Sequence, residues 1–210
     1  MPVAILLPPA TTSRRREGAG RPGRISAHTA CQLVARYTHS GELVIDLDAN
    51  PAIHAAAGWL ERRSLTVTDH HPERPHQREF FSPRPGDPAR VVIATLPRPG
   101  AANLPGLTAW MRQASDQLLA PGGFLLTVVA GTGAGRHTDH ATTIITAATA
   151  AGLSWHQHII DVHTPLPEHE PRAEPDTAAA TTPRLVRGRH RRVHNDLLAF
   201  TTVGGEDPDA

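Results

Sequence analysis

Short apolar runs alternate along the chain with longer segments in which apolar residues recur every three or four positions. Continuous runs such as Leu43–Ile45 and Val91–Ala94 are typical of strands that are buried on both faces of a parallel sheet. The intervening segments have the apolar spacing of amphipathic helices, as in Leu107–Leu119. The expected elements are helix 27–37, strand 43–45, helix 52–63, strand 65–68, strand 91–94, helix 107–119, strand 124–129, helix 143–151, strand 153–162 and strand 196–203. This alternation predicts an α/β fold in which helices cover both faces of a mainly parallel sheet.

Three segments lack this periodicity. Residues 1–25 include a polar, glycine-containing stretch with three consecutive arginines, and we expect a flexible N-terminal arm there. Residues 164–183 consist largely of Pro, Ala, Thr and acidic residues, which is typical of a disordered insertion. An acidic tail follows at 204–210. Because 210 residues suit one hydrophobic core, we expect a single domain over residues 26–203.

Composition limits the cellular setting and the kinds of site. Cys31 is the only cysteine, so neither an intrachain disulfide nor a CxxC zinc motif is available, and an intracellular, reducing setting is favoured. No apolar run approaches the length of a membrane span or follows the pattern of a secretory signal. We therefore expect a cytoplasmic protein that is not bound to a membrane.

Three phrases carry a resemblance to a known family. They are GELVID at residues 41–46, LLAPGGFLL at 118–126 and HNDLLAF at 194–200. In this order and spacing the sequence resembles S-adenosylmethionine-dependent methyltransferases of the Rossmann-like class. More narrowly, it is similar to bacterial DNA methyltransferases that modify the exocyclic amine of adenine or cytosine. The resemblance implies a methyltransferase fold with an antiparallel C-terminal strand, and S-adenosylmethionine as the cofactor.

The resemblance also implies a set of cofactor-binding residues after the first two strands. The family has a glycine-rich loop after the first strand, and its two glycine positions fall here on Asn50 and Ala52. Asp69 stands where the family's acidic residue would accept hydrogen bonds from ribose hydroxyls, and an ordinary turn aspartate is the alternative interpretation. The implied contacts to the cofactor are Asp46, Asp48, Asn50, Ala52 and Asp69.

The family's catalytic phrase, an Asp, Asn or Ser followed by Pro-Pro and an aromatic residue, aligns with residues 95–98. Thr95 would hold the target amine, Pro97 matches the family, and Arg98 replaces the aromatic ring that stacks on a flipped base. Because both the cofactor loop and the amine clamp differ from the family, one hypothesis is a catalytically impaired methyltransferase. A non-catalytic nucleic-acid or partner-binding protein that keeps the fold is the second, and a methyltransferase for another substrate is the third.

Basic residues and histidines offer two further candidate sites. All 21 basic residues are arginines, which indicates compositional bias, yet five of them gather near the C-terminus at Arg184, Arg187, Arg189, Arg191 and Arg192. Such a cluster would neutralise DNA phosphates, and a solvated loop is the alternative. The 14 histidines follow no metal-binding motif, so we predict no metal site.

Overall fold

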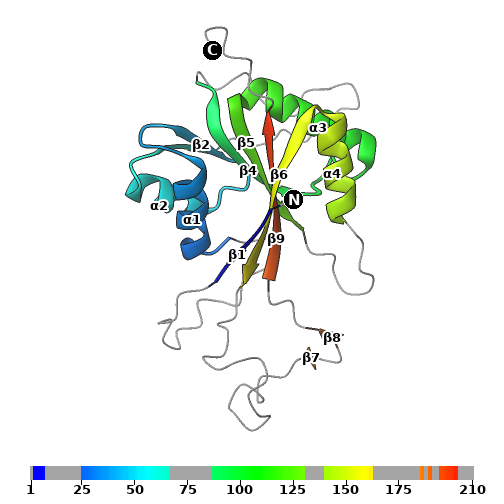
Figure 1. Cartoon of the computed structure of the whole chain (residues 1–210), viewed down its shortest axis with the longest axis horizontal. Helices are drawn as coiled ribbons and strands as arrows, with labels where there is room; N and C mark the ends of the chain where they lie inside the picture. The colour runs from blue at the N-terminus through cyan, green and yellow to red at the C-terminus, as the bar shows by residue number, and fades with distance from the viewer. Residues whose placement is uncertain are drawn as a thin grey trace.

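The computed structural model describes residues 2–7, 25–66, 87–130, 140–162, 185–186, 189–190 and 194–202. A seven-stranded sheet crosses the molecule, with helices on either side of it (Figure 1). The strands of this sheet are β1 (Val3–Leu6), β2 (Leu43–Asp46), β3 (Arg63–Thr66), β4 (Ala89–Leu96), β5 (Leu119–Val129), β6 (Leu153–Val162) and β9 (His194–Thr202). The helices are α1 (Ala27–Tyr37), α2 (Pro51–Trp59), α3 (Leu104–Leu118) and α4 (His140–Ala150). Strands β7 (Leu185–Val186) and β8 (Arg189–His190) pair separately.

The strand order is β1-β6-β9-β5-β4-β2-β3. All neighbouring strands pair in parallel except β9, which lies antiparallel between β5 and β6. The predicted α/β class, the mainly parallel Rossmann-like sheet and the antiparallel C-terminal strand are therefore confirmed.

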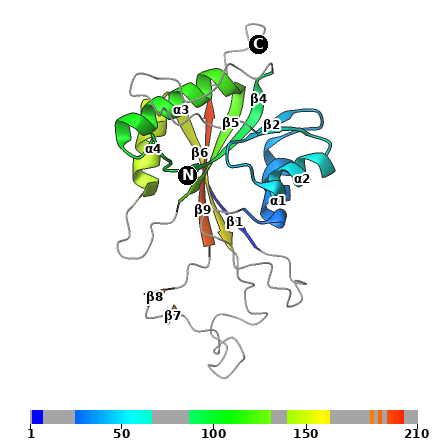
Figure 2. The ribbon, with the colours of Figure 1, turned by 180° about the vertical axis from the view of Figure 1, so that it is seen from behind.

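Helices cover both faces of the sheet, as predicted. Helices α1 and α2 lie on one face, and α3 and α4 lie on the other (Figures 1 and 2). Successive strand residues point to opposite faces, so Val44 packs in the cluster with α1 and α2, whereas Ile45 packs in the cluster with α3 and α4. Both residues are fully buried, which explains why this strand is a continuous apolar run.

Side-chain caps set the starts of the helices. Ser26 Oγ accepts the backbone N–H of Thr29 at 3.1 Å and begins α1 at the predicted residue. Asn103 Oδ1 accepts the backbone N–H of Gly106 at 2.9 Å. Helix α3 therefore begins at Leu104 and not at the predicted Leu107.

Other predicted element boundaries are also wrong. Residues 3–6 of the predicted N-terminal arm form β1, which pairs with β6. Helix α2 ends at Trp59 and not at Arg63, because Glu61 adopts a φ of 60° and turns the chain into β3. In addition, β5 begins at Leu119, directly after α3, so Pro121-Gly122-Gly123 lies within a strand.

Several predicted features fall outside the described residues. They are residues 8–24 of the arm, the insertion at 164–183, the tail at 204–210 and Asp69. Within the part of the chain that the structure describes, no helix combines the length and the apolar character needed to cross a membrane.

Candidate functional site

The order of the strands in the sheet changes direction between β2 and β4. From β2 it passes through α2 to β3 on one side, and from β4 it passes through α3 to β5 on the other side. Strands β2 and β4 are themselves parallel neighbours, and Asp46 pairs in register with Ile93. In open α/β sheets, ligands bind outside the carboxyl ends of the strands at such a switch point. The two loops that follow β2 and β4 are therefore the first place to look for a site.

The loop after β2 is built around the carboxylate of Asp46. This side chain is buried, and its Oδ1 accepts the backbone N–H of Asp48 at 3.0 Å. Its Oδ2 accepts the backbone N–H of Asn50. The turn between them places Ala49 at a φ of 51°, which an L residue rarely adopts. Asp46 thus fixes the shape of the loop.

Burial raises the pKa of the Asp46 carboxyl above its ordinary value. The backbone N–H groups of Asp48 and Asn50 act against this shift, because they stabilise the carboxylate. The Asp48 carboxylate raises the pKa further and the Arg98 guanidinium lowers it. Ionisation of Asp46 is therefore less favourable in the folded protein than in a solvent-exposed aspartate.

Asn50 joins this loop to two helices. Its Oδ1 accepts the backbone N–H of Ala52 at 3.0 Å and caps the start of α2. Its Nδ2 donates to the backbone carbonyl of Ile25 at 3.3 Å, just before α1. The side chain of Asn50 therefore holds the entry to α1 against the loop after β2.

The end of β4 and the loop that follows it contact the loop after β2 through the carboxylate of Asp48. The backbone N–H and the hydroxyl of Thr95 both donate to Asp48 Oδ2, at 2.7 and 2.6 Å. Nη2 of Arg98 lies 3.5 Å from Asp48 Oδ1 and also donates to the carbonyl of Leu47 at 3.2 Å. The Arg98 guanidinium carbon lies 5.6 Å from the ring centroid of Trp110, a cation–π contact with a fully buried side chain.

The structure brings together most of the predicted site residues. Those at this edge of the sheet are Asp46, Asp48, Asn50, Ala52, Thr95, Pro97 and Arg98. Asp69, Arg184, Arg187, Arg191 and Arg192 lie outside the described residues, and Arg189 lies in β8. The predicted cofactor loop and the predicted amine clamp are thus adjacent, but in this structure Thr95 donates to Asp48.

Sequence reasoning missed the parts played by Trp110 and Ile25. The periodicity of the helix correctly placed Trp110 in the core, but gave no sign that Arg98 would lie against its ring. Ile25 contributes its backbone carbonyl to Asn50, and a backbone contact leaves no signal in the sequence.

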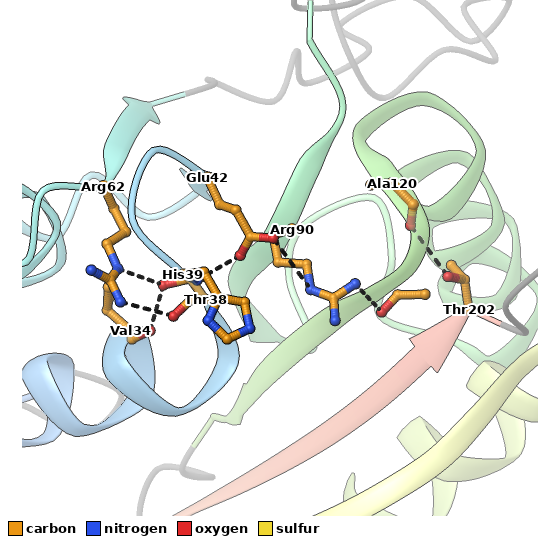
Figure 3. Close-up of polar contacts among 9 residues, drawn as sticks. Val34, Thr38, His39, Glu42, Arg62, Arg90, Ala120 and Thr202 are labelled. Atoms are coloured by element: carbon orange, nitrogen blue, oxygen red, sulfur yellow. Dashed lines mark hydrogen bonds and ion pairs between the residues drawn. The ribbon is translucent and has the colours of Figure 1, made fainter.

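A second polar network lies at the opposite, amino ends of β2 and β4 (Figure 3). Nη2 of Arg62 donates to the carbonyl of Thr38 at 2.9 Å, at the end of α1. Nη1 of Arg90 donates to the carbonyl of Gly122 at 2.9 Å, and its Nε lies 4.0 Å from Glu42. Arg62 binds the carbonyl that follows α1 and Arg90 binds a carbonyl within β5, so we interpret this network as structural.

Two histidine side chains lie beside the carboxylate of Asp196. Nε2 of His158 lies 3.1 Å from Asp196 Oδ1, and Nε2 of His194 lies 3.6 Å from Asp196 Oδ2. Within the described ranges, no three His, Cys, Asp or Glu side chains are arranged to hold a metal ion.

Comparison with known proteins gives similarity of structure only. No family model and no curated protein matches the chain. A methyltransferase from Pyrococcus furiosus matches with 10% identity and a TM-score of 0.46 over 84% of both chains. A protein-(glutamine-N5) methyltransferase from Alicyclobacillus acidocaldarius has 14% identity and a TM-score of 0.43, over 88% of this chain and 94% of that one. A protein from Thermus thermophilus that is named as a putative DNA modification methylase has 18% identity and a TM-score of 0.33, over 84% of this chain and 51% of that one. Similarity at this level assigns no activity to the chain.

Proposed function

We propose that this chain binds S-adenosylmethionine at the carboxyl ends of β2 and β4 and is a methyltransferase-like protein related to the DNA amino-methyltransferases. One observation carries the proposal. The residues that the resemblance implies for the cofactor and for the substrate come from two separate segments, the end of β2 and the end of β4 with the residues that follow each, and these segments meet at the switch point of the sheet.

The chemistry of the site fits this cofactor. S-Adenosylmethionine carries a sulfonium and an ammonium group, and the edge of the sheet holds the carboxylates of Asp46 and Asp48. Asp48 retains 27% of its side-chain surface exposed, and its carboxylate already contacts Thr95 and Arg98. Asp46 is buried and acts through the backbone, by fixing the loop that carries Asp48.

The bound cofactor would supply a methyl group for in-line transfer to a nucleophile. The chain's part in such a transfer is positioning and electrostatic stabilisation. Asn50 holds the loop against α1 and α2, and Thr95 at the end of β4 and Pro97 just after it lie on the acceptor side. In the proposed role, Thr95 orients the acceptor amine.

Isothermal titration calorimetry with S-adenosylmethionine tests the proposal directly. We expect saturable binding with one site per chain, and competition by S-adenosylhomocysteine. Absence of binding at millimolar cofactor would contradict the proposal. The role of Asp69 is tested in the same way: if its carboxylate holds the ribose hydroxyls, Asp69→Ala weakens binding by about 1–3 kcal/mol.

A non-catalytic protein that binds nucleic acid on the same fold is the second candidate. It is favoured by the engagement of the predicted amine clamp within the chain, since both donors of Thr95 point to Asp48 and Arg98 contacts Trp110. The proposed DNA contacts are the arginines at 184, 187, 189, 191 and 192. DNA affinity that falls steeply between low and moderate salt would support this candidate, and a flat response would contradict it.

A further inference from the structure

A chain of hydrogen bonds runs from β6 to the loop after β2. Oδ1 of Asp161, near the end of β6, accepts a hydrogen bond of 2.6 Å from the hydroxyl of Thr29 in the first turn of α1. Oγ of Ser26, the cap of α1, lies 2.8 Å from the Thr29 oxygen, and because Thr29 gives its one proton to Asp161, Ser26 is the donor in this second bond. Ser26 follows Ile25, whose carbonyl accepts a hydrogen bond of 3.3 Å from Nδ2 of Asn50. The end of β6 is thereby connected to the loop of the candidate site.

We propose that Asp161 and Thr29 are positioning residues for the loop after β2, and that through Ser26 and Asn50 they set the affinity of the site for the cofactor. Neither residue needs to touch the cofactor for this role. The cofactor's part in this inference rests on the proposed function. The positioning of the loop does not, because it follows from contacts within the chain.

The first turn of α1 depends on this polar pair for its place on the sheet. Of the residues 27–29 that open the helix, only Thr29 is buried, and the buried apolar residues of α1 begin at Ala30. Ile25 also packs in the core, but apolar contacts have no preferred direction, whereas a hydrogen bond fixes both a distance and an angle. Thr29 and Asp161 are 1% and 2% exposed, which excludes water from their bond. The pair therefore determines where along the sheet α1 begins.

Asn50 carries this position into the loop after β2. Its Nδ2 donates to the carbonyl of Ile25, its backbone N–H donates to Oδ2 of Asp46, and its Oδ1 accepts the backbone N–H of Ala52. If the Ile25 carbonyl moves, Asn50 keeps all three bonds only when the loop moves with it. The loop and the start of α2 therefore follow the start of α1.

Amide hydrogen exchange without cofactor tests the positioning. In Thr29→Val, which keeps the shape of the side chain and removes the hydroxyl, we expect several-fold faster exchange at the backbone N–H groups of Asn50 and Ala52, the loop amides. The amide of Gly106 should exchange as in the wild type. It is the matched amide, because it is bonded to the capping side chain of Asn103 at the start of α3, on the opposite face of the sheet (Figure 1). No rise at the loop amides, or an equal rise at Gly106, would overturn the proposal, since an equal rise reports loss of stability alone.

Two variants separate the hydroxyl from a general loss of stability. Thr29→Ser removes a buried methyl group but keeps the donor to Asp161, so the loop amides should exchange as in the wild type. Rates as fast as those of Thr29→Val would overturn the proposal. Asn103→Ala should give the reverse pattern, with faster exchange at Gly106 and unchanged loop amides. Faster loop amides in Asn103→Ala would show that they respond to any loss of stability, which again overturns the proposal.

The part of the carboxylate is tested by Asp161→Asn. The amide oxygen can still accept from Thr29, but the bond is weaker without the charge, so we expect a smaller rise at the loop amides. Unchanged rates would remove Asp161 from the positioning role. If Thr29→Val does not fold, Thr29→Ala takes its place with the same expected and contradicting results, because alanine favours the helix and also lacks the hydroxyl.

Calorimetry with S-adenosylmethionine tests the link to the cofactor. We expect Thr29→Val to bind several-fold more weakly than the wild type, and Thr29→Ser and Asn103→Ala to bind with wild-type affinity. If Thr29→Val has faster loop amides but wild-type affinity, the link to the cofactor is wrong. If the wild type does not bind the cofactor, the proposed function fails, and the exchange rates still decide whether Asp161 and Thr29 position the loop.

Discussion

The hydroxyl of Thr29 donates a hydrogen bond of 2.6 Å to Oδ1 of Asp161, across 132 positions of the sequence. Both residues are buried, with 1% and 2% of their surface exposed. Thr29 lies in the first turn of α1 and Asp161 lies near the end of β6, so the bond joins the helix to the side of the sheet that contains β1. It is one of the contacts that hold α1 over the edge where the candidate site lies.

Loss of this hydrogen bond should destabilise the fold. We expect Thr29→Val, which keeps the shape of the side chain, to lower the free energy of unfolding by about 1–3 kcal/mol, because a buried carboxylate oxygen loses a close donor. Urea unfolding followed by circular dichroism measures the difference. Thr149→Val is the matched control, since the hydroxyl of Thr149 bonds only within α4 and is exposed. A cost no larger than that of the control would show that Thr29 does not hold the helix to the sheet.

Tyr37 gives a prediction about alkaline pH. Burial raises its pKa above the ordinary value of 10.0, although the nearby Arg36 acts in the opposite direction. Its hydroxyl donates to Oε1 of Gln157 at 2.9 Å. The folded state therefore keeps the proton more tightly than the unfolded state, so the contribution of Tyr37 to stability is complete below pH 10 and is lost as the pH rises through the folded pKa.

The chain makes this titration easy to observe, because Tyr37 is its only tyrosine. The near-ultraviolet absorbance of tyrosinate should appear above pH 10 in the folded protein and near pH 10 in urea. Tyr37→Phe removes both the absorbance change and the matching part of the loss of stability. A titration midpoint in the folded protein at or below that in urea would contradict the prediction.

Asn50 is expected to act on both stability and cofactor binding. Its side chain caps α2 and also donates to the carbonyl of Ile25, so Asn50→Ala should cost about 0.5–2 kcal/mol of unfolding free energy. Asn103→Ala is the control, because Asn103 caps α3 in the same way. Both variants should lose stability, but under the proposed function only Asn50→Ala should weaken the binding of S-adenosylmethionine in calorimetry. Equal affinities in the two variants would remove Asn50 from the cofactor site.

The sequence predicted correctly the bounds of those elements in which buried positions recur in a regular apolar pattern. Strand β6 begins and ends at the predicted residues, and α1 does the same, because each combines a regular pattern with a clear boundary such as Ser26 or Gly152. Strand β1 was missed because it has only four residues and alternates less clearly. Val3 and Ile5 remain 58% and 60% exposed, and β1 is defined by its pairing with β6, which lies far away in the sequence.

The strand-end residues of the candidate site could be predicted from the sequence, but the contacts between its two segments could not. The position of Asp46 at the end of a buried strand, and of Thr95 at the end of another, follows from the pattern of apolar runs. That the two loops are joined by Asp48 does not follow from any local pattern, because the partners Asp48 and Thr95 are 47 positions apart. The contact of Arg98 with Trp110 likewise depends on how α3 returns across the face of the sheet.

Two glycines that undergo the same substitution should respond with opposite signs. In α2, a Cβ on Gly58 would meet nothing within 4 Å, and its φ is not in the left-handed range. In β5, a Cβ on Gly123 would lie 2.8 Å from the carbonyl oxygen of Ala120 and 3.2 Å from those of Ala89 and Arg90. Gly58→Ala should therefore stabilise the protein by about 0.4–1 kcal/mol, because alanine lowers the entropy of the unfolded chain.

Gly123→Ala should instead destabilise it by about 1–3 kcal/mol, because three backbone oxygens of β4 and β5 would have to move apart. Denaturant midpoints of the two variants, measured against wild type under the same conditions, check both signs. Because the chemical change is identical, any general effect of replacing glycine by alanine cancels between the two variants. A Gly123→Ala protein as stable as Gly58→Ala would mean that the start of β5 does not pass this close to β4.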